Sequence, residues 1–558
     1  ALTAVLFLLA VWVLDRASTL PRSALAMAAV FHVTGCLGLR VLRRAIHERA
    51  LVKVAPVRSK TGTQAPALLL IGQPALADTY LRDAARAHDR RYTPVGIIGL
   101  DLRDVGQQVR GVCILESLDR LDEALVDLRR WNRYPRAVLF LDEPSKIKGL
   151  SPDHLGRFKA EGVRMLRLPS IVDLRHHEGV ALMPLRDVSV EELLAREPIE
   201  LDAAPLAALI RGRRVLITGA GGSIGGELAR QVAGFDCAHL TLVDSSESAL
   251  FAIDREVAET YPGVSRTAVL CDVRHAGRLQ GHFAAQTPDL VFHAAALKHV
   301  SMVERHPCEG VLTNVIGTWN VAEAARLCGA AQMVLISTDK AVDPTNVMGA
   351  TKRLAEAVIQ AQQTHGGKTR FAAVRFGNVL GSAGSVVPIF KSQIERGGPV
   401  TLTHPDMTRF FMTIPEAVQL VLHATAASAE DRDAQARLFI LDMGEPVRIM
   451  DLARQMIALS GRTLGQDIEI EVTGLRPGEK LTETLLDEDE QATPCAPKVM
   501  QVVSNSAVGI TPGHLQTLEA LAEQADAEGV RTALFDLVGQ VRGQRPGGAP
   551  RLKVVAGG

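Results

Sequence analysis

Short apolar runs alternate with longer segments of helical periodicity through most of residues 211–542. Runs rich in Val, Ile and Leu that are too short for helices predict buried strands, and apolar positions spaced by three and four residues predict the helices between them. The strands expected from this pattern are 215–217, 239–243, 268–270, 290–292 and 333–336. Because sustained strand–helix alternation is typical of a parallel sheet with helices on both faces, we predict a doubly wound α/β domain with a smaller C-terminal substrate-binding part.

A second, smaller α/β unit is expected upstream, at residues 46–180. Its first strand ends in Gly72-Gln73-Pro74, which lacks the glycine spacing that a dinucleotide site requires. We therefore predict a degenerate Rossmann-like domain with a structural or regulatory role. The runs that indicate its strands are 67–72, 92–98, 111–114 and 136–141. The remaining segments are interpreted as a packed linker at 181–210 and a flexible tail at 543–558.

Two uncharged apolar runs open the chain, at residues 2–14 and 24–39. At about 13 and 16 residues they fall short of the roughly 20 that cross a bilayer, and the chain begins on Ala, so we interpret the first run as a truncated transmembrane helix. The alternatives are a buried core helix or a signal peptide. A basic stretch from Arg40 to Lys60 then predicts that the downstream part is cytoplasmic, behind transmembrane helices at residues 1–45.

Composition narrows the class of partner. Lysine plus arginine and aspartate plus glutamate each number 62, so no excess of positive charge points to nucleic acid. The 7 cysteines are scattered and never form a CxxC pair, which favours reduced thiols in a cytosol over a zinc site or a disulfide framework. We therefore predict neither a metal nor a nucleic-acid partner.

The first predicted strand runs into a glycine cluster, VLITGAGGSIG, at residues 215–225. Gly219 permits a tight turn, Gly222 lets the backbone approach a pyrophosphate, and Gly225 lets the following helix lie close to the strand. Free amides at the start of that helix, around Ser223 and Ile224, would face the anion. A glycine-rich turn that binds no ligand is the alternative, so this motif alone is weak.

The second strand ends on Asp244, at the distance where a carboxylate accepts hydrogen bonds from both ribose hydroxyls of an adenosine. Such a carboxylate would repel a 2′-phosphate, which favours NAD over NADP. Asn314 lies on a helix and has a structural alternative, because its amide could tie neighbouring strands together. The other expected cofactor residues are Ser245, Asp272, Val273, Ala294 and Ala295.

Candidate chemistry follows the fifth strand, which ends at Ser337. Open parallel sheets bind ligands beyond the carboxyl ends of their strands, so the Thr338-Asp339-Lys340 turn places a hydroxyl, a carboxylate and an amine where a substrate would lie. A helix carrying Met348 and Lys352 follows after a short loop.

Five stretches together resemble the extended short-chain dehydrogenase/reductases, and more closely the membrane-bound nucleotide-sugar 4,6-dehydratases of the CapD-like polysaccharide biosynthesis family. They read TGAGGSIG, HAAALKHVSMVE, STDKAVDPTNVMGATKR, RFGNVLGSAGSVVPIF and GLRPGEKLTETL. The resemblance covers the whole chain. It implies an NAD-dependent lyase that converts UDP-N-acetylglucosamine into a UDP-4-keto-6-deoxy-N-acetylhexosamine for surface glycans, as a homo-oligomer in the bacterial inner membrane.

The resemblance also implies a route in three steps: oxidation at C4 with hydride passing to NAD, loss of water across C5 and C6, and return of the hydride to C6. Thr338 would hydrogen-bond the 4-oxygen, and Lys352 would hold the nicotinamide ribose. Asp339 would protonate the leaving 6-hydroxyl and Lys340 would take the C5 proton. Met348 stands where most relatives have the tyrosine base, and a thioether cannot replace a phenolate, so Asp339 or a water near Lys352 remain alternatives.

A sugar-nucleotide site is implied in the C-terminal part, where arginine forks suit a diphosphate. Its expected residues are Lys298, Asn378, Ser385, Arg409, Arg476 and Glu479. Two other functions stay open. A nucleotide-sugar 4-epimerase would share fold and cofactor but would want tyrosine at Met348, and a non-catalytic dinucleotide-binding scaffold would not need the paired acid and amine.

Overall fold

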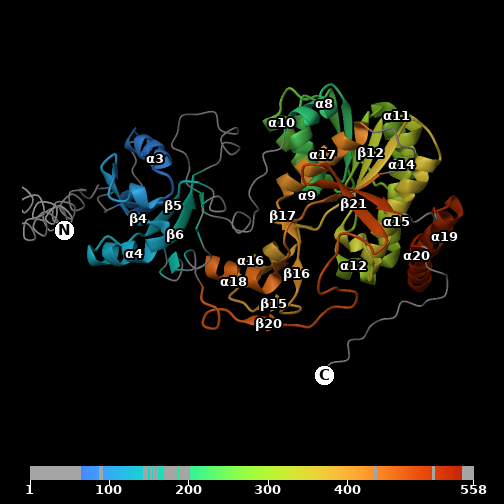
Figure 1. The fold of residues 1–558 in the computed structure, drawn as a ribbon. Coiled ribbons are helices and arrows are strands. Elements are labelled where there is room, and N and C mark those ends of the chain that lie inside the picture. The colour runs from blue at the N-terminus through green and yellow to red at the C-terminus, as the bar shows by residue number, and fades with distance from the viewer. Residues whose placement is uncertain are drawn as a thin grey trace, which may run out of the picture. The chain divides into compact units, whose positions relative to one another are not determined.

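The computed structural model describes residues 65–86, 92–142, 163–168, 202–430, 437–460, 462–504 and 509–542, with a few isolated positions between 147 and 187. It divides the chain into two compact units, Ala1–Val188 and Ser189–Gly558, and the division falls inside the linker predicted at 181–210 (Figure 1).

The first unit is built on a seven-stranded sheet of order β3-β4-β2-β1-β5-β6-β7. The five inner strands run parallel, and the two edge strands are antiparallel to their neighbours. Its strands are β1 (Ala67–Ile71), β2 (Thr93–Gly99), β3 (Gln108–Val109), β4 (Val112–Ser117), β5 (Ala137–Phe140), β6 (Arg164–Arg167) and β7 (Arg186–Asp187), with helices α3 (Pro74–Arg86) and α4 (Leu121–Arg130). Helix α3 starts on Pro74, a first-turn position where the missing N–H of proline is tolerated.

The second unit contains a nine-stranded sheet of order β10-β9-β8-β11-β12-β13-β18-β22-β21. Seven strands are parallel, and β22 and β21 are added antiparallel at one edge. Its strands are β8 (Arg214–Thr218), β9 (His239–Asp244), β10 (Arg266–Leu270), β11 (Leu290–His293), β12 (Gln332–Ile336), β13 (Arg370–Arg375), β18 (Arg437–Leu441), β21 (Glu490–Ala496) and β22 (Val499–Ser504). The order reverses between β8 and β11, which makes this place the topological switch point.

Helices cover both faces of this sheet, as Figure 1 shows. Alternate strand residues point to opposite faces, so Val215 and Ile217 join one core while Leu216 joins the other. The helices are α8 (Ala204–Ile210), α9 (Ser223–Ala233), α10 (Glu247–Thr260), α11 (Ala276–Gln286), α12 (Val300–Arg305), α13 (Pro307–Val311), α14 (Gly317–Cys328), α15 (Val347–Thr364) and α17 (Ile414–Glu430). The prediction of a doubly wound α/β domain is confirmed for this unit.

Two further groups of elements flank the sheet. One packs α16 (Val386–Glu395) and α18 (Ile449–Leu459) around a separate apolar core. Its paired short strands are β14 (Asn378–Val379) with β17 (Phe411–Met412), β15 (Val400–Leu402) with β20 (Ile470–Val472), and β16 (Thr408–Arg409) with β19 (Val447–Arg448). The other group, α19 (Pro512–Glu523) and α20 (Ala527–Val541), shares a core with α15.

The fold prediction needs one correction, which concerns the transmembrane helices placed at residues 1–45. Among the residues described above, no helix is long and apolar enough to cross a membrane. The two apolar runs at 2–14 and 24–39 lie outside the described residues. Each run is also shorter than the roughly 20 residues that span a bilayer, so the prediction had to assume a missing part of a helix.

Candidate active site

The glycine loop after β8 is shaped by close approaches that only glycine allows. Gly219 has a φ of 69°, and a Cβ there would lie 2.6 Å from the backbone nitrogen of Ala295. A Cβ on Gly225 would overlap the carbonyl oxygen of Gly219, so α9 can lie against the loop only without a side chain at this position. Gly222 precedes α9 as its N-cap, and no side chain caps the first turn. The cradle therefore leaves helix amides for a pyrophosphate, with Ala294 and Ala295 beside it.

Asp244 lies at the end of β9, beside the glycine loop. Its Oδ2 accepts from the backbone N–H of Gly221 at 2.9 Å, and its Oδ1 accepts from that of Ser246 at 2.8 Å. Each carboxylate oxygen can accept more than one hydrogen bond, so this anchoring leaves capacity for ribose hydroxyls. Ser245 is exposed next to it. The geometry suits the predicted adenosine contact.

Two other expected cofactor residues have clear protein partners. Burial raises the pKa of Asp272, but hydrogen bonds from Arg274 outweigh burial and hold that pKa below its usual range. Asn314 donates to the Leu297 carbonyl at 3.0 Å and to the Thr351 hydroxyl at 2.9 Å. Its Oδ1 also accepts from the Leu297 N–H at 2.8 Å. Asn314 thus ties the 297 loop to α15, rather than two neighbouring strands as the structural alternative supposed. Val273 is buried and packs against Gly317.

The turn after β12 brings its three chemical groups together. The Thr338 hydroxyl donates to Asp339 Oδ1 at 2.8 Å, and Lys340 Nζ donates to the same oxygen at 2.8 Å. Lys340 Nζ also donates to Asn378 Oδ1 at 3.1 Å, which joins the turn to β14. The structure therefore places four sequence-predicted residues in one hydrogen-bonded group.

Asp339 is the deepest member of this group. Its side chain is 0% exposed, and within the described part of the chain its Oδ2 has no hydrogen-bond partner. A Cβ on Gly377 would lie 3.3 Å from that oxygen and 2.9 Å from the Cβ of Phe410, so only glycine fits beside Asp339 at this position. Buried carboxylate oxygens are normally hydrogen-bonded. Oδ2 therefore retains an unused capacity to accept a hydrogen bond among the described residues.

Helix α15 supplies Met348 and Lys352. Lys352 Nζ donates to the Ile336 carbonyl at 2.6 Å, and burial lowers the pKa of Lys352 to about 8. Met348 is buried in the apolar core that α15 shares with α19 and α20. A Cβ on Gly349 would overlap the Lys340 carbonyl oxygen, so the first turn of α15 packs directly on the Thr338-Asp339-Lys340 turn.

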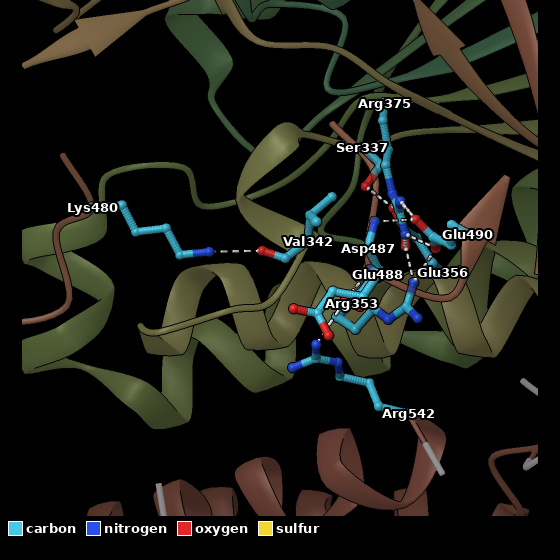
Figure 2. A network of polar contacts seen from close by, with 10 residues as sticks. All are labelled: Ser337, Val342, Arg353, Glu356, Arg375, Lys480, Asp487, Glu488, Glu490 and Arg542. Atoms are coloured by element: carbon cyan, nitrogen blue, oxygen red, sulfur yellow. Dashed lines mark hydrogen bonds and ion pairs between the residues drawn. The ribbon is translucent and has the colours of Figure 1, made fainter. Parts of the chain in front are cut away.

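The loop between that turn and α15 is held by later parts of the chain. Lys480 Nζ donates to the carbonyls of Val342 and Asp343 at 3.0 and 2.5 Å. Arg542 binds the Asp343 carboxylate at 2.5 Å and that of Asp487 at 2.7 Å. Figure 2 shows Lys480 reaching Val342, and Arg542 approaching from below α15.

The residues expected to bind the substrate differ in how far they are exposed to solvent. Arg409 is 7% exposed and donates to the carbonyls of Leu481 and Lys480, at 3.0 and 2.8 Å. Arg476 and Lys298 are exposed, and the backbone N–H of Arg476 donates to Glu479 at 3.1 Å. These arginines therefore occupy different environments, one buried on backbone oxygens and one at the surface.

Ser385 occupies the N-cap position of α16, and its buried hydroxyl has no partner within the described residues. The neighbouring Ala383 N–H donates to the Ser223 hydroxyl at 3.3 Å. This contact brings the 382–385 loop to the start of α9, so a substrate site and a cofactor site predicted 160 residues apart adjoin.

Sequence reasoning missed two buried titratable groups near the site. His293 ends β11 and makes hydrogen bonds with the hydroxyls of Thr218 and Thr318, at 2.7 and 3.0 Å. Burial and the Lys352 cation lower the pKa of His293 to about 3, so the ring is neutral. Glu483 is 5% exposed with Arg409 Nη2 at 3.9 Å, and burial raises its pKa. Their signals were a histidine at a strand end and a glutamate inside GLRPGEKLTETL.

Four further charged residues form a buried ion quartet below Ser337: Arg353, Glu356, Arg375 and Glu490 (Figure 2). Sequence analysis did not single out this quartet, because its members come from α15, β13 and β21.

Fold and site together define a nucleotide-binding protein of the short-chain dehydrogenase/reductase type. The family profile described as polysaccharide biosynthesis protein matches residues 215–504. The chain belongs to this polysaccharide biosynthesis family, as the resemblance of its motifs predicted.

Three known proteins illustrate the similarity. The capsular polysaccharide biosynthesis protein CapD of Staphylococcus aureus is 42% identical over 429 residues, which are 76% of this chain and 69% of CapD. The probable polysaccharide biosynthesis protein EpsC of Bacillus subtilis (strain 168) is 46% identical over 353 residues, 63% of this chain and 57% of EpsC. The match thus spans little more than half of EpsC. The dTDP-glucose 4,6-dehydratase DesIV of Streptomyces venezuelae, solved with NAD bound, is 20% identical over 49% of this chain and 88% of DesIV, with a TM-score of 0.42.

Proposed function

We propose that this protein is an NAD-dependent nucleotide-sugar 4,6-dehydratase that acts on UDP-N-acetylglucosamine and forms a UDP-4-keto-6-deoxy-N-acetylhexosamine. The observation that carries the proposal is the Thr338-Asp339-Lys340 turn, which joins a hydroxyl, a buried carboxylate and an amine through one oxygen at 2.8 Å each. Elimination of water needs an acid for the 6-hydroxyl and a base for the C5 proton, whereas epimerisation at C4 needs only a base for the 4-hydroxyl and has no use for this second pair.

The glycine cradle and Asp244 support NAD as the cofactor. A side chain at Gly219 or Gly225 would collide with backbone, and Asp244 lies beside the loop where it can accept from ribose hydroxyls. Lys352 would hold the nicotinamide ribose. NAD, when bound, supplies a reversible hydride acceptor, so that the hydrogen removed from C4 can later be returned to C6 and the net change is the loss of water.

The hydrogen bond from Thr338 to Asp339 suggests how the chain works without a tyrosine. Thr338 would accept the proton of the sugar 4-hydroxyl while passing its own to Asp339 Oδ1, over the 2.8 Å between these atoms. The carboxylate would thereby become the acid that the next step requires. Met348 then has no proton to carry, which fits its place in an apolar core.

The elimination uses the two residues that follow Thr338, namely Asp339 as the acid and Lys340 as the base. Lys340, as the free amine, takes the proton from C5, and the C5–H electron pair forms the C5–C6 double bond as the C6–O bond breaks. Asp339 gives its proton to the departing oxygen, which leaves as water. Lys340 later returns its proton to C5, so both side chains end in the protonation states in which they began.

Incubation of the purified protein with UDP-N-acetylglucosamine, followed by mass analysis, tests the proposal. A dehydratase produces a sugar nucleotide lighter by about 18 Da. An isomer of unchanged mass would support an epimerase instead, and unchanged substrate in the presence of bound NAD would favour a non-catalytic scaffold.

A further inference from the structure

The ion quartet is a closed set of two acids and two bases away from water. Arg375 donates to Glu356 at 2.8 and 2.7 Å and to Glu490 at 2.6 and 3.0 Å. Arg353 donates to the same two carboxylates, at 3.3 and 3.1 Å. Exposure of the four side chains does not exceed 5%. Figure 2 shows them converging between β13, β21 and α15.

Stability alone does not account for this arrangement. Taking charges out of water is costly, and well-packed apolar residues of similar volume often stabilise a fold as well or better. The two carboxylates are also not equivalent. Glu490 accepts in addition from the backbone N–H of Asp487 at 2.9 Å, whereas Glu356 accepts from the Ser337 hydroxyl at 2.6 Å. One acid therefore faces a loop, and the other faces the residue before the catalytic turn.

Glu356 also lies one helical turn after Lys352 on α15, on the same face. Lys352 Nζ donates to the carbonyl of Ile336, and Glu356 accepts from Ser337, so two neighbouring side chains of α15 hold two consecutive residues at the end of β12. Among the described residues, Glu356 from α15 is the charged group that acts on the pKa of Lys352, and the buried ring of His293, from β11, is neutral. Arg375 and Arg353 outweigh the effect of burial and keep the pKa of Glu356 below its usual range, so this carboxylate stays an anion.

We propose that Glu356 is a positioning residue for the reaction, and that the ion quartet holds its carboxylate on the hydroxyl of Ser337, one helical turn after Lys352 on α15. Its hydrogen bond holds Ser337, the residue before the Thr338-Asp339-Lys340 turn. Its negative charge favours the protonated form of Lys352. The inference rests on the proposed function in one respect, namely that Lys352 holds the ribose of NAD. Glu490 binds the same two arginines but accepts from Asp487 instead of Ser337 and belongs to β21, which makes it a matched control.

The test compares Glu356→Gln with Glu490→Gln in the full chain. NAD⁺ affinity is measured by calorimetric titration between pH 6 and 9.5, and thermal unfolding is followed on the same samples. Both variants are expected to unfold at lower temperature, because each removes one anion from two buried arginines. Only Glu356→Gln should move the midpoint of the pH dependence to lower pH, by roughly one unit, since one close opposite charge is lost from Lys352. Equal midpoints in both variants would overturn the proposal.

Ser337→Ala covers the case in which the charge variants do not fold. It keeps all four charges and removes only the hydroxyl that links Glu356 to β12. NAD⁺ affinity at pH 7 should fall several-fold, with a smaller loss of unfolding temperature than in either charge variant because only one hydrogen bond is removed, and unchanged affinity would refute the positioning role. Dehydration of UDP-N-acetylglucosamine is assayed separately. If the wild-type protein binds NAD⁺ but does not dehydrate UDP-N-acetylglucosamine, the proposed reaction is refuted. The comparison of pH midpoints still tests the role of Glu356, because it measures only NAD⁺ binding.

Discussion

The hydroxyl of Thr338 donates to Asp339 Oδ1 at 2.8 Å, and the second oxygen of that carboxylate is buried without a partner among the described residues. In the mechanism proposed above, Oδ1 receives the proton that comes from the 4-hydroxyl through Thr338, and Asp339 then gives a proton to the leaving 6-hydroxyl. Because Asp339 has both of these roles, its replacement is the first prediction.

Asp339→Asn should lower kcat by about 10² to 10⁴, because it removes both the proton acceptor and the acid of the elimination. Lys340→Ala should have an effect of similar size through loss of the base. Affinities for NAD⁺ and the UDP-sugar should change little, since neither side chain is assigned to the pyrophosphate or the uracil. Kinetics combined with binding titrations check this, and full turnover by Asp339→Asn would refute the assigned roles.

Met348→Tyr should not increase turnover and should destabilise the protein by about 1–3 kcal/mol, because a ring must fit where a flexible thioether lies in a packed core. Met348→Leu, which keeps the volume, is the control and should be close to neutral. Thermal unfolding and kcat are measured together. A large gain in kcat for the tyrosine variant would show that methionine is a defect and that this chain has lost a base.

Asp244→Ala should weaken NAD⁺ binding by about tenfold to a hundredfold, the range expected for lost hydrogen bonds to a charged acceptor. The bias against NADP⁺ should relax at the same time, because the carboxylate that repels a 2′-phosphate is gone. Glu259→Ala, an exposed change on α10, serves as control. A wild-type protein that prefers NADP⁺ would contradict the assignment of Asp244.

His293→Gln should make the protein less sensitive to acid. Burial holds the pKa of His293 at about 3, below the ordinary value of 6.5, so the unfolded chain binds a proton more readily between these values. The stabilising contribution of the neutral ring is present above pH 6.5 and is lost as pH falls toward 3. Unfolding temperatures of wild type and variant, measured from pH 7 to 4, should therefore converge or cross. Parallel curves would show that His293 does not carry the acid response.

Local patterns predicted much of the fold. The strands around 215–217 and 333–336 could be recognised because short apolar runs rich in β-branched residues, bounded by turns, are typical of buried strands. The glycine loop could be recognised because close backbone contacts require glycine at this spacing. The Thr338-Asp339-Lys340 turn could be placed in the same way, at the carboxyl end of a parallel strand, and its role in the chemistry stays a prediction.

What escaped prediction depends on contacts between distant segments. Glu490 meets Arg375 across 115 residues, and Thr218 meets His293 across 75, so no local period reveals either pair. Arg409 also has contacts that its place in the sequence did not reveal, and its expected role as a diphosphate ligand stays a prediction. Its type and motif suggested a diphosphate ligand, while its position places its guanidinium on the carbonyls of Leu481 and Lys480.

Arg542, just after α20, binds Asp343, three residues beyond Lys340. The family profile ends at residue 504, and every motif used to recognise the chain lies before that point. A gene fragment that ends with those motifs would still encode each side chain of the proposed chemistry. The loop that carries Asp343 would nevertheless lose its ion pair with Arg542. The shortest expression product worth making therefore ends no earlier than Arg542, and affinity tags belong beyond it.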